Sequence, residues 1–117
     1  MEILIKEIIE THHANGGSTT ALDGSVPTGG YVVSPYPDVE EKHPYLTKNI
    51  LESYIYAYKY RLAQTKHYLG TWLDETTSMT YLDVVIVVET LEQAIQIAKR
   101  YNQKAIYDLE KGETIYV

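Results

Sequence analysis

Apolar residues recur along the chain with two spacings, and these spacings predict helices in some segments and strands in others. In the first 13 residues the spacing is that of one helical face, formed by Met1, Leu4, Ile5, Ile8 and Ile9. A strand over Glu2–Ile9 is the alternative, because Ile3 and Ile5 also alternate with polar residues. We favour the helix and expect Asn15-Gly16-Gly17 to end it, since glycine readily takes the left-handed cap conformation.

The next segment, 18–36, has the pattern of two short strands on either side of a turn. Thr19–Leu22 and Tyr31–Ser34 favour extended structure, and Asp23-Gly24 is a strong tight-turn signal. We therefore expect a hairpin here. Prolines at 35, 37 and 44 then predict an extended connector from Pro35 to Tyr45.

A second helix is predicted to begin at Asn49, where Asn49 can cap the first turn and Glu52 can reach back to it. The alternating tyrosines in this segment also fit a strand. About sixteen residues rich in alanine, leucine, lysine and glutamine favour a helix instead. Its expected core face is Leu51, Tyr54, Ile55, Tyr58 and Leu62.

The second half of the chain predicts a strand hairpin, a helix and two further strands. Alternating patterns over Tyr68–Asp74 and Met79–Glu89 flank a polar turn. Thr90-Leu-Glu-Gln93 is a capping box that begins a helix through about Arg100, and Asn102 is expected to end it. Strands at 104–109 and 113–117 follow. The inward side of the helix is expected to be Leu91, Ala94, Ile95, Ala98 and Tyr101.

These elements predict one α+β domain over residues 1–117. Residues 1–45 would form the N-terminal helix, a hairpin and the extended connector, and residues 46–117 an α-β-β-α-β-β body. The expected fold is a two-layer sandwich, in which helices cover one face of an antiparallel sheet in a ferredoxin-like or related arrangement.

The predicted hairpin of Tyr68–Asp74 and Met79–Glu89 carries the sole tryptophan, so it is the first candidate for a functional surface. Alternation places Tyr68, Trp72, Tyr81 and Asp83 on the side of the sheet opposite the aliphatic residues. Three environments fit these rings: burial under residues 16–45, an interface between copies of the chain, or a surface for a ligand or partner. Twelve tyrosines, one tryptophan and no phenylalanine indicate many half-buried aromatic positions, which suits an oligomer.

Composition narrows the classes of function. The chain has 44% hydrophobic and 22% charged residues, and its apolar runs are too short to span a membrane. It has no cysteine, which excludes disulfides and thiolate chemistry and suits a cytoplasmic protein. A net charge of −6 argues against direct nucleic-acid binding.

Candidate chemistry is sparse. The histidines at 12, 13, 43 and 67 lack metal-ligand spacing, so we expect solvated surface histidines and no metal. Asp74, Glu75, Asp83 and Asp108 lie near strand ends, where turn formation explains them better than acid–base catalysis. Asn102 and Tyr107 could bind a small polar ligand such as a nucleotide, although helix capping explains Asn102 better.

Several segments together resemble a family of small uncharacterised proteins of bacteriophages, plasmids and bacteria. They are GGYVVSPY, YLGTW, YLDV and NQKAIYDL, and the resemblance covers about Gly16–Val117. It implies a mobile-element setting and no particular activity.

We therefore expect a non-enzymatic binding protein that forms homo-oligomers and needs no cofactor. Its partner would be a protein, and by analogy with small acidic proteins of mobile elements it would antagonise a host defence system. The alternative is a protein that sequesters a nucleotide signal, or a small nucleotide-acting enzyme. Both hypotheses use residues from one set: Tyr68, Trp72, Tyr81, Asp83, Asn102 and Tyr107.

Overall fold

The structure is a computed structural model that describes residues 1–117. Three α-helices and one 3-10 helix accompany seven strands, all of which join one antiparallel sheet. The predicted α+β class and the N-terminal helix are therefore confirmed. In chain order the elements are α1 (Glu2–Asn15), β1 (Gly17–Thr20), β2 (Tyr31–Val33), η1 (Pro37–Val39), β3 (Glu41–His43), α2 (Lys48–Leu62), β4 (His67–Asp74), β5 (Met79–Val88), α3 (Leu91–Arg100), β6 (Ala105–Asp108) and β7 (Glu113–Tyr116).

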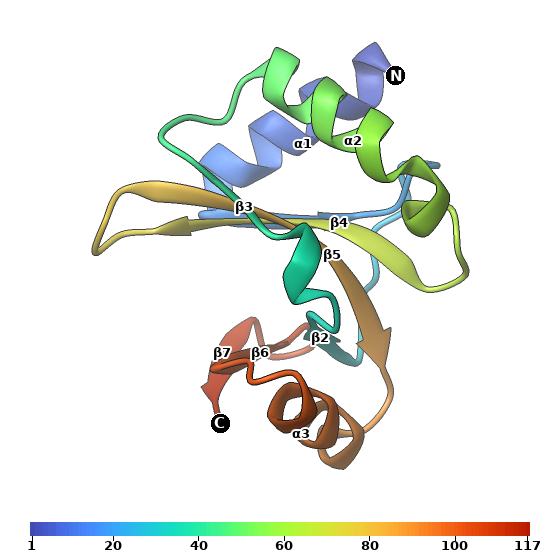
Figure 1. The fold of residues 1–117 in the computed structure, drawn as a ribbon, viewed down its shortest axis with the longest axis vertical. Helices are drawn as coiled ribbons and strands as arrows, with labels where there is room; N and C mark the ends of the chain where they lie inside the picture. The colour runs from blue at the N-terminus through green and yellow to red at the C-terminus, as the bar shows by residue number, and fades with distance from the viewer.

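The strand order is β1-β4-β5-β2-β6-β7, and β3 pairs with β5 on the edge that also carries β2. The sheet curls strongly into a half-barrel, with β1 and β4 at one end and β6 and β7 at the other (Figure 1). A ferredoxin-like arrangement is not shown. Instead, seven strands form one strongly curled half-barrel sheet, and the helix α1 precedes them.

All three helices lie on the same side of the sheet. On β5, Leu82 and Val84 pack into the core formed with α1 and α2, while Ile86 and Val88 pack against the core under α3. These four residues alternate on one side of a strand that pairs with β4 without a bulge. The curl of the sheet carries α1 and α2 to one end of the molecule and α3 to the other, so the inner side faces away from every helix (Figure 1).

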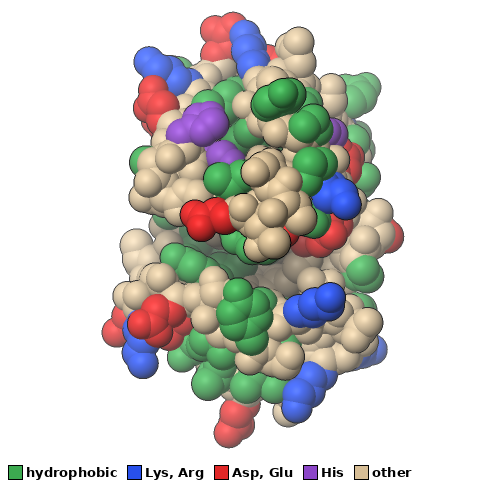
Figure 2. Space-filling view, turned by 90° about the vertical axis from the view of Figure 1, so that its left-hand side faces the viewer, with side chains coloured by type: hydrophobic (Ala, Val, Ile, Leu, Met, Phe, Trp, Pro, Cys, Tyr) green, Lys and Arg blue, Asp and Glu red, His purple; other side chains and the backbone are tan.

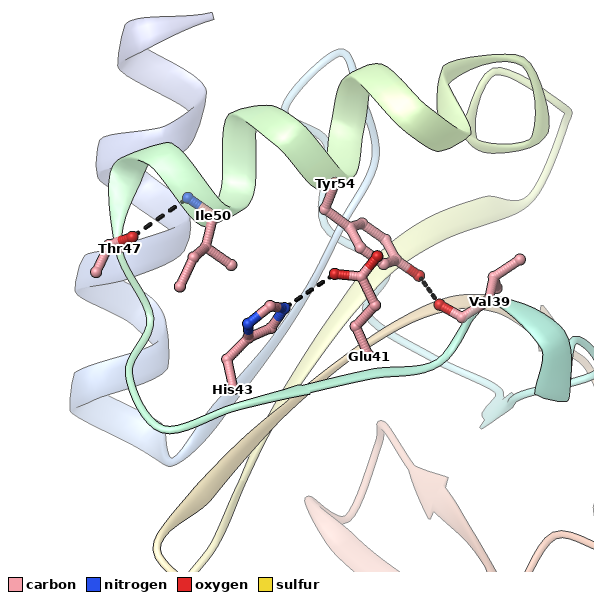
Figure 3. Close-up of polar contacts among 6 residues, drawn as sticks. All are labelled: Val39, Glu41, His43, Thr47, Ile50 and Tyr54. Carbon is pink, nitrogen blue, oxygen red and sulfur yellow. Dashed lines mark hydrogen bonds and ion pairs between the residues drawn. The ribbon is translucent and has the colours of Figure 1, made fainter.

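The larger core joins α1 and α2 to β4 and β5. The predicted α1 face is largely correct, since Leu4, Ile5 and Ile8 are buried, but Met1, the N-cap residue before the helix, is 66% exposed. Tyr54 of α2 is buried, and its hydroxyl donates to the carbonyl oxygen of Val39 over 2.8 Å (Figure 3). This bond ties α2 to η1. The core contains Leu4, Ile5, Ile8, Val39, Leu46, Leu51, Tyr54, Ile55, Leu62, Leu69, Leu82 and Val84.

Both helix starts follow capping rules, although one differs from the prediction. The hydroxyl of Thr47 accepts from the amide of Ile50 over 3.2 Å, so the residue that caps α2 lies two positions before the predicted Asn49 (Figure 3). The capping box of α3 is confirmed, with both Thr90–Gln93 bonds present.

The predicted hairpin between residues 18 and 36 is wrong. Residues 21–25 do form a closed turn, but β1 pairs with β4, whereas β2 lies between β5 and β6. The reason is burial: Val32 and Val33 are 9% and 1% exposed, and a strand buried on both sides belongs in the middle of a sheet. The polar strand β1 suits an edge. Within the predicted extended connector the chain also forms η1 and β3.

A smaller core lies under α3 and contains Val33, Ala94, Ala98 and Ile106. Two residues expected on the inward side of this helix are not buried: Leu91 is 37% exposed and Tyr101 36%. Leu91 is the first residue of α3, and Tyr101 is the C-cap residue that follows it. None of the helices is long and apolar enough to cross a membrane.

Candidate binding face

The inner side of the curled sheet, which we call the concave face, carries five of the six predicted site residues. Strand alternation and register assign each side chain to this side. Viewed from its open side, the surface is hollowed between the two ends of the molecule, and hydrophobic side chains lie on both borders (Figure 2). The concave face comprises Val32, Lys42, Tyr68, Gly70, Trp72, Tyr81, Asp83, Val85, Val87 and Tyr107.

An aromatic pair occupies one border of the concave face. Trp72 of β4 lies opposite Tyr81 of β5, and their ring centroids are 5.5 Å apart with planes tilted by 35°. Trp72 remains 52% exposed. On its other side it faces Gly17 of β1, which has no side chain to cover the indole. The pair therefore presents aromatic surface to solvent.

The N-terminal segment does not bury these rings. Between residues 16 and 45 the three strands β1, β2 and β3 add to the edges of β4 and β5, so they extend the sheet in its own plane. They do not form a layer over Trp72, whose exposure is the direct evidence. Of the three environments considered for the rings, burial under this segment is excluded for Trp72.

The floor of the concave face is apolar and tightly packed. Val32 and Val85 are 9% and 6% exposed. A Cβ atom built on Gly70 would lie 3.0 Å from Cγ1 of Val85, closer than an ordinary contact. The valine therefore needs a glycine across the strand pair, and this close approach accompanies the curl of the sheet.

Asp83 lies in this face opposite Gly70. The Ser34 hydroxyl donates to its Oδ2, while Oδ1 is buried with no hydrogen-bond partner. Burial raises the pKa of Asp83 from 3.8 to about 7; the Ser34 bond lowers it, and the charge of nearby Glu40 adds to the rise. The carboxyl group therefore changes protonation state close to neutral pH.

Of the three remaining residues predicted for the site, two lie on the concave face and one lies in the loop after α3. Tyr107 of β6 lies opposite Val32 and is 40% exposed, and Tyr68 lies opposite Val85. Asn102 lies outside the strands, in the loop after α3, with a left-handed backbone (φ 57°) that ends the helix. The structure therefore separates Asn102 from the other five residues.

His12 departs from the prediction of surface histidines. It is 2% exposed, and its Nδ1 lies 2.8 Å from the hydroxyl of Thr71, which lies 2.6 Å from the hydroxyl of Ser18. Burial lowers the pKa of His12, and the charge of His13 acts in the same direction. Polar side chains of β1 and β4 made this burial possible, and no local sequence pattern signals it. His12 fastens α1 to the outer side of the sheet.

A second polar cluster lies where α2 ends and β4 begins. The Tyr36 hydroxyl lies 2.7 Å from Nε2 of His67, whose Nδ1 lies 3.0 Å from the carbonyl oxygen of Thr65. Since Nδ1 must donate to a carbonyl, Nε2 of the neutral ring accepts from the tyrosine. Arg61 stacks over the Tyr36 ring at 4.6 Å and pairs with Asp38 at 3.4 Å. No group of three or more His, Cys, Asp or Glu residues is placed to hold a metal ion.

The concave face thus carries two aromatic rings on which a ligand could stack, and the hydrogen-bonded pair of Ser34 and Asp83, whose carboxyl group has a pKa raised to about 7. Ser34 and Lys42 join it although the sequence did not single them out, because only the pairing of β2 and β3 with β5 brings them there. No protein-family model matches the chain, and no curated protein or solved structure gives a significant match. The resemblance to mobile-element proteins stays a prediction.

Proposed function

We propose that the chain is a non-enzymatic binding protein that holds a partner protein on the concave face. The observation that carries this proposal is the half-exposed Trp72 beside Tyr81, on the side of the sheet that no helix covers. Exposed aromatic surface of this kind is typical of recognition sites, and tryptophan and tyrosine commonly anchor protein partners.

The partner's chemistry follows from the charges near the aromatic pair. The faces of Trp72 and Tyr81 attract a cation. Asp83, two residues from Tyr81 on the same side of β5, is buried and keeps its proton up to about pH 7, so the rings supply most of this attraction. The protein as a whole carries a net charge of −6. Lys42 lies opposite Tyr81 and limits the acidic character of the face. We therefore propose that a single lysine or arginine side chain of the partner enters the hollow.

The setting of this activity rests on the resemblance alone. A mobile-element protein of this kind would act in the host cytoplasm and occupy a protein of the host's defence system. The alternative partner is a nucleotide signal stacked on the same rings. The concave face supports that alternative with Asp83 and Tyr107, but Asn102 lies outside it.

The emission of Trp72 offers a direct test, because it is the sole indole of the chain. The protein would be titrated with a peptide of alternating arginine and glycine and with a matched glutamate–glycine peptide. We expect a saturable change with the basic peptide alone. Tyr81→Ala should weaken binding at least roughly tenfold, the loss typical of an aromatic anchor.

Tyr101→Ala is the matched control, since Tyr101 is partly exposed at the end of α3, away from the concave face. It should bind like the wild type, and circular dichroism would verify that both variants fold. Equal losses in the two variants, or no response to the basic peptide, would refute the proposal. A saturable response to nucleotides instead would establish the alternative.

A further inference from the structure

The outward side of α2 differs from those of the other two helices. Exposed positions of α1 carry Glu2, Lys6, Glu7 and Glu10, and those of α3 carry Glu92, Gln96, Lys99 and Arg100. Among the exposed positions of α2 only Lys48, in the first turn, is charged; the uncharged stripe that follows consists of Ser53, Tyr56, Ala57 and Tyr60, and the helix is kinked at Tyr58. A helix side that faces only water usually carries charge, so this stripe requires an explanation.

The two tyrosines of the stripe are large and exposed. Tyr56 is 73% exposed and Tyr60 83%, and Nζ of Lys59 lies 4.6 Å and 5.3 Å from their ring centroids. Ser53 and Ala57 are small residues four positions apart, so they lie one above the other on the helix. Small residues flanked by rings allow another helix to approach closely and interlock with the rings.

A surface hollow of about 590 Å³ lies beside the stripe, between the start of α1, α2 and the turn after β1. Its lining is apolar at Met1, Leu22, Ile55 and Tyr56 and polar at Glu52, Ser53 and Lys59. An aromatic ring entering from outside would therefore meet apolar surface.

We propose that this stripe is the contact between two copies of the chain, with their α2 helices packed antiparallel about Tyr56 and Ala57. In that arrangement Tyr60 of each copy lies over Ser53 of the other, next to the hollow. Charge favours the antiparallel direction: Lys59 and Arg61 lie at the C-terminal end of the stripe, whereas Glu52 at the other end pairs with Lys48 of its own helix at 3.8 Å, so the two basic ends do not meet. A two-fold axis makes the contact self-complementary.

This contact is separate from the concave face. The helices lie on the outer side of the curled sheet (Figure 1), and the register of β4 with β5 assigns Trp72 to the inner side. Pairing through α2 would leave the concave faces of both copies open. The two proposals can therefore fail independently.

Sedimentation velocity on the intact protein tests the contact. At about 100 µM we expect the wild type to have twice the chain mass of 13.4 kDa, and Ala57→Arg to have the mass of one chain. Gln96→Arg adds the same charge at an exposed position of α3 and should stay dimeric. A wild type that is monomeric at this concentration, or two variants that behave alike, would overturn the proposal.

A charge exchange tests the direction of packing. Glu52→Lys should raise the dissociation constant at least roughly tenfold, and adding Lys59→Glu should restore it. Trp72→Ala should leave the dimer intact. If Trp72→Ala abolishes the dimer while Ala57→Arg does not, the copies meet through the concave face and the α2 contact is wrong.

Discussion

Replacing Asp83 with asparagine should change how the stability of the protein depends on pH. In the folded chain burial raises the pKa of Asp83 from 3.8 to about 7. Between these values the folded protein holds a proton that the unfolded chain has released. Stability therefore decreases as the pH rises through this window and does not change further above about pH 7. Asp83→Asn keeps the size of the side chain but cannot ionise.

The magnitude follows from the width of the window. From pH 5 to pH 7 the difference of about one bound proton costs roughly 1.4 kcal/mol per pH unit, or about 2–3 kcal/mol in total. The side chain keeps some contact with solvent, so screening places the expected value toward the lower end of this range.

Urea denaturation followed by circular dichroism at pH 5 and pH 8 measures this effect. Other groups titrate in both proteins, so the relevant quantity is the wild-type free energy of unfolding minus that of Asp83→Asn. This difference should fall by about 2 kcal/mol from pH 5 to pH 8. Ser25, whose hydroxyl donates to Asp23 on the exposed turn, provides a control position. The wild-type free energy of unfolding minus that of Ser25→Ala should be the same at pH 5 and pH 8. For Asp83→Asn, a difference that is flat with pH would show that Asp83 is ionised throughout.

Two further predictions concern other parts of the molecule. Burial lowers the pKa of His12 below its ordinary value of 6.5, so the protein should lose stability as the pH drops below about 6.5. The NMR signals of the His12 ring should titrate below that value. A midpoint at or above 6.5 would contradict the burial of the ring. Gly30→Ala should destabilise by roughly 1–3 kcal/mol or more in thermal denaturation, because Gly30 has φ 90° and a Cβ there would lie 2.7 Å from the carbonyl oxygen of Val88. Gly29→Ala meets nothing within 4 Å and should match the wild type; equal effects would refute the steric argument.

Much of the fold could be read from local patterns. The hairpin of β4 and β5, the capping box at Thr90 and the end of α1 at Gly16 match the prediction, because each depends on residues close together in the chain. The core face of α2 follows from helical periodicity in the same way. Alternation likewise predicted that Trp72 and Tyr81 share a side.

Apart from the capping residue of α2, which is a local error, the wrong predictions have one cause: the partner of the segment lies far away in the sequence. His12 has the local pattern of a surface residue, and only its contact with Thr71, 59 positions away, accounts for its burial. Ser34 reaches Asp83 across 49 positions. A periodic pattern states which residues share a side, but it does not state what covers that side.

The amino-acid sequence by itself determined the helices, most of the strands and the set of aromatic residues on one side of the central hairpin, since these depend on spacing and local hydrogen bonding. Only the tertiary structure decided that β1 and β2 separate to distant places in the sheet and that the sheet curls. Pairing between remote strands is selected by the burial of both sides of each strand, and that burial exists only once the chain has folded. The same global packing leaves Trp72 open to solvent.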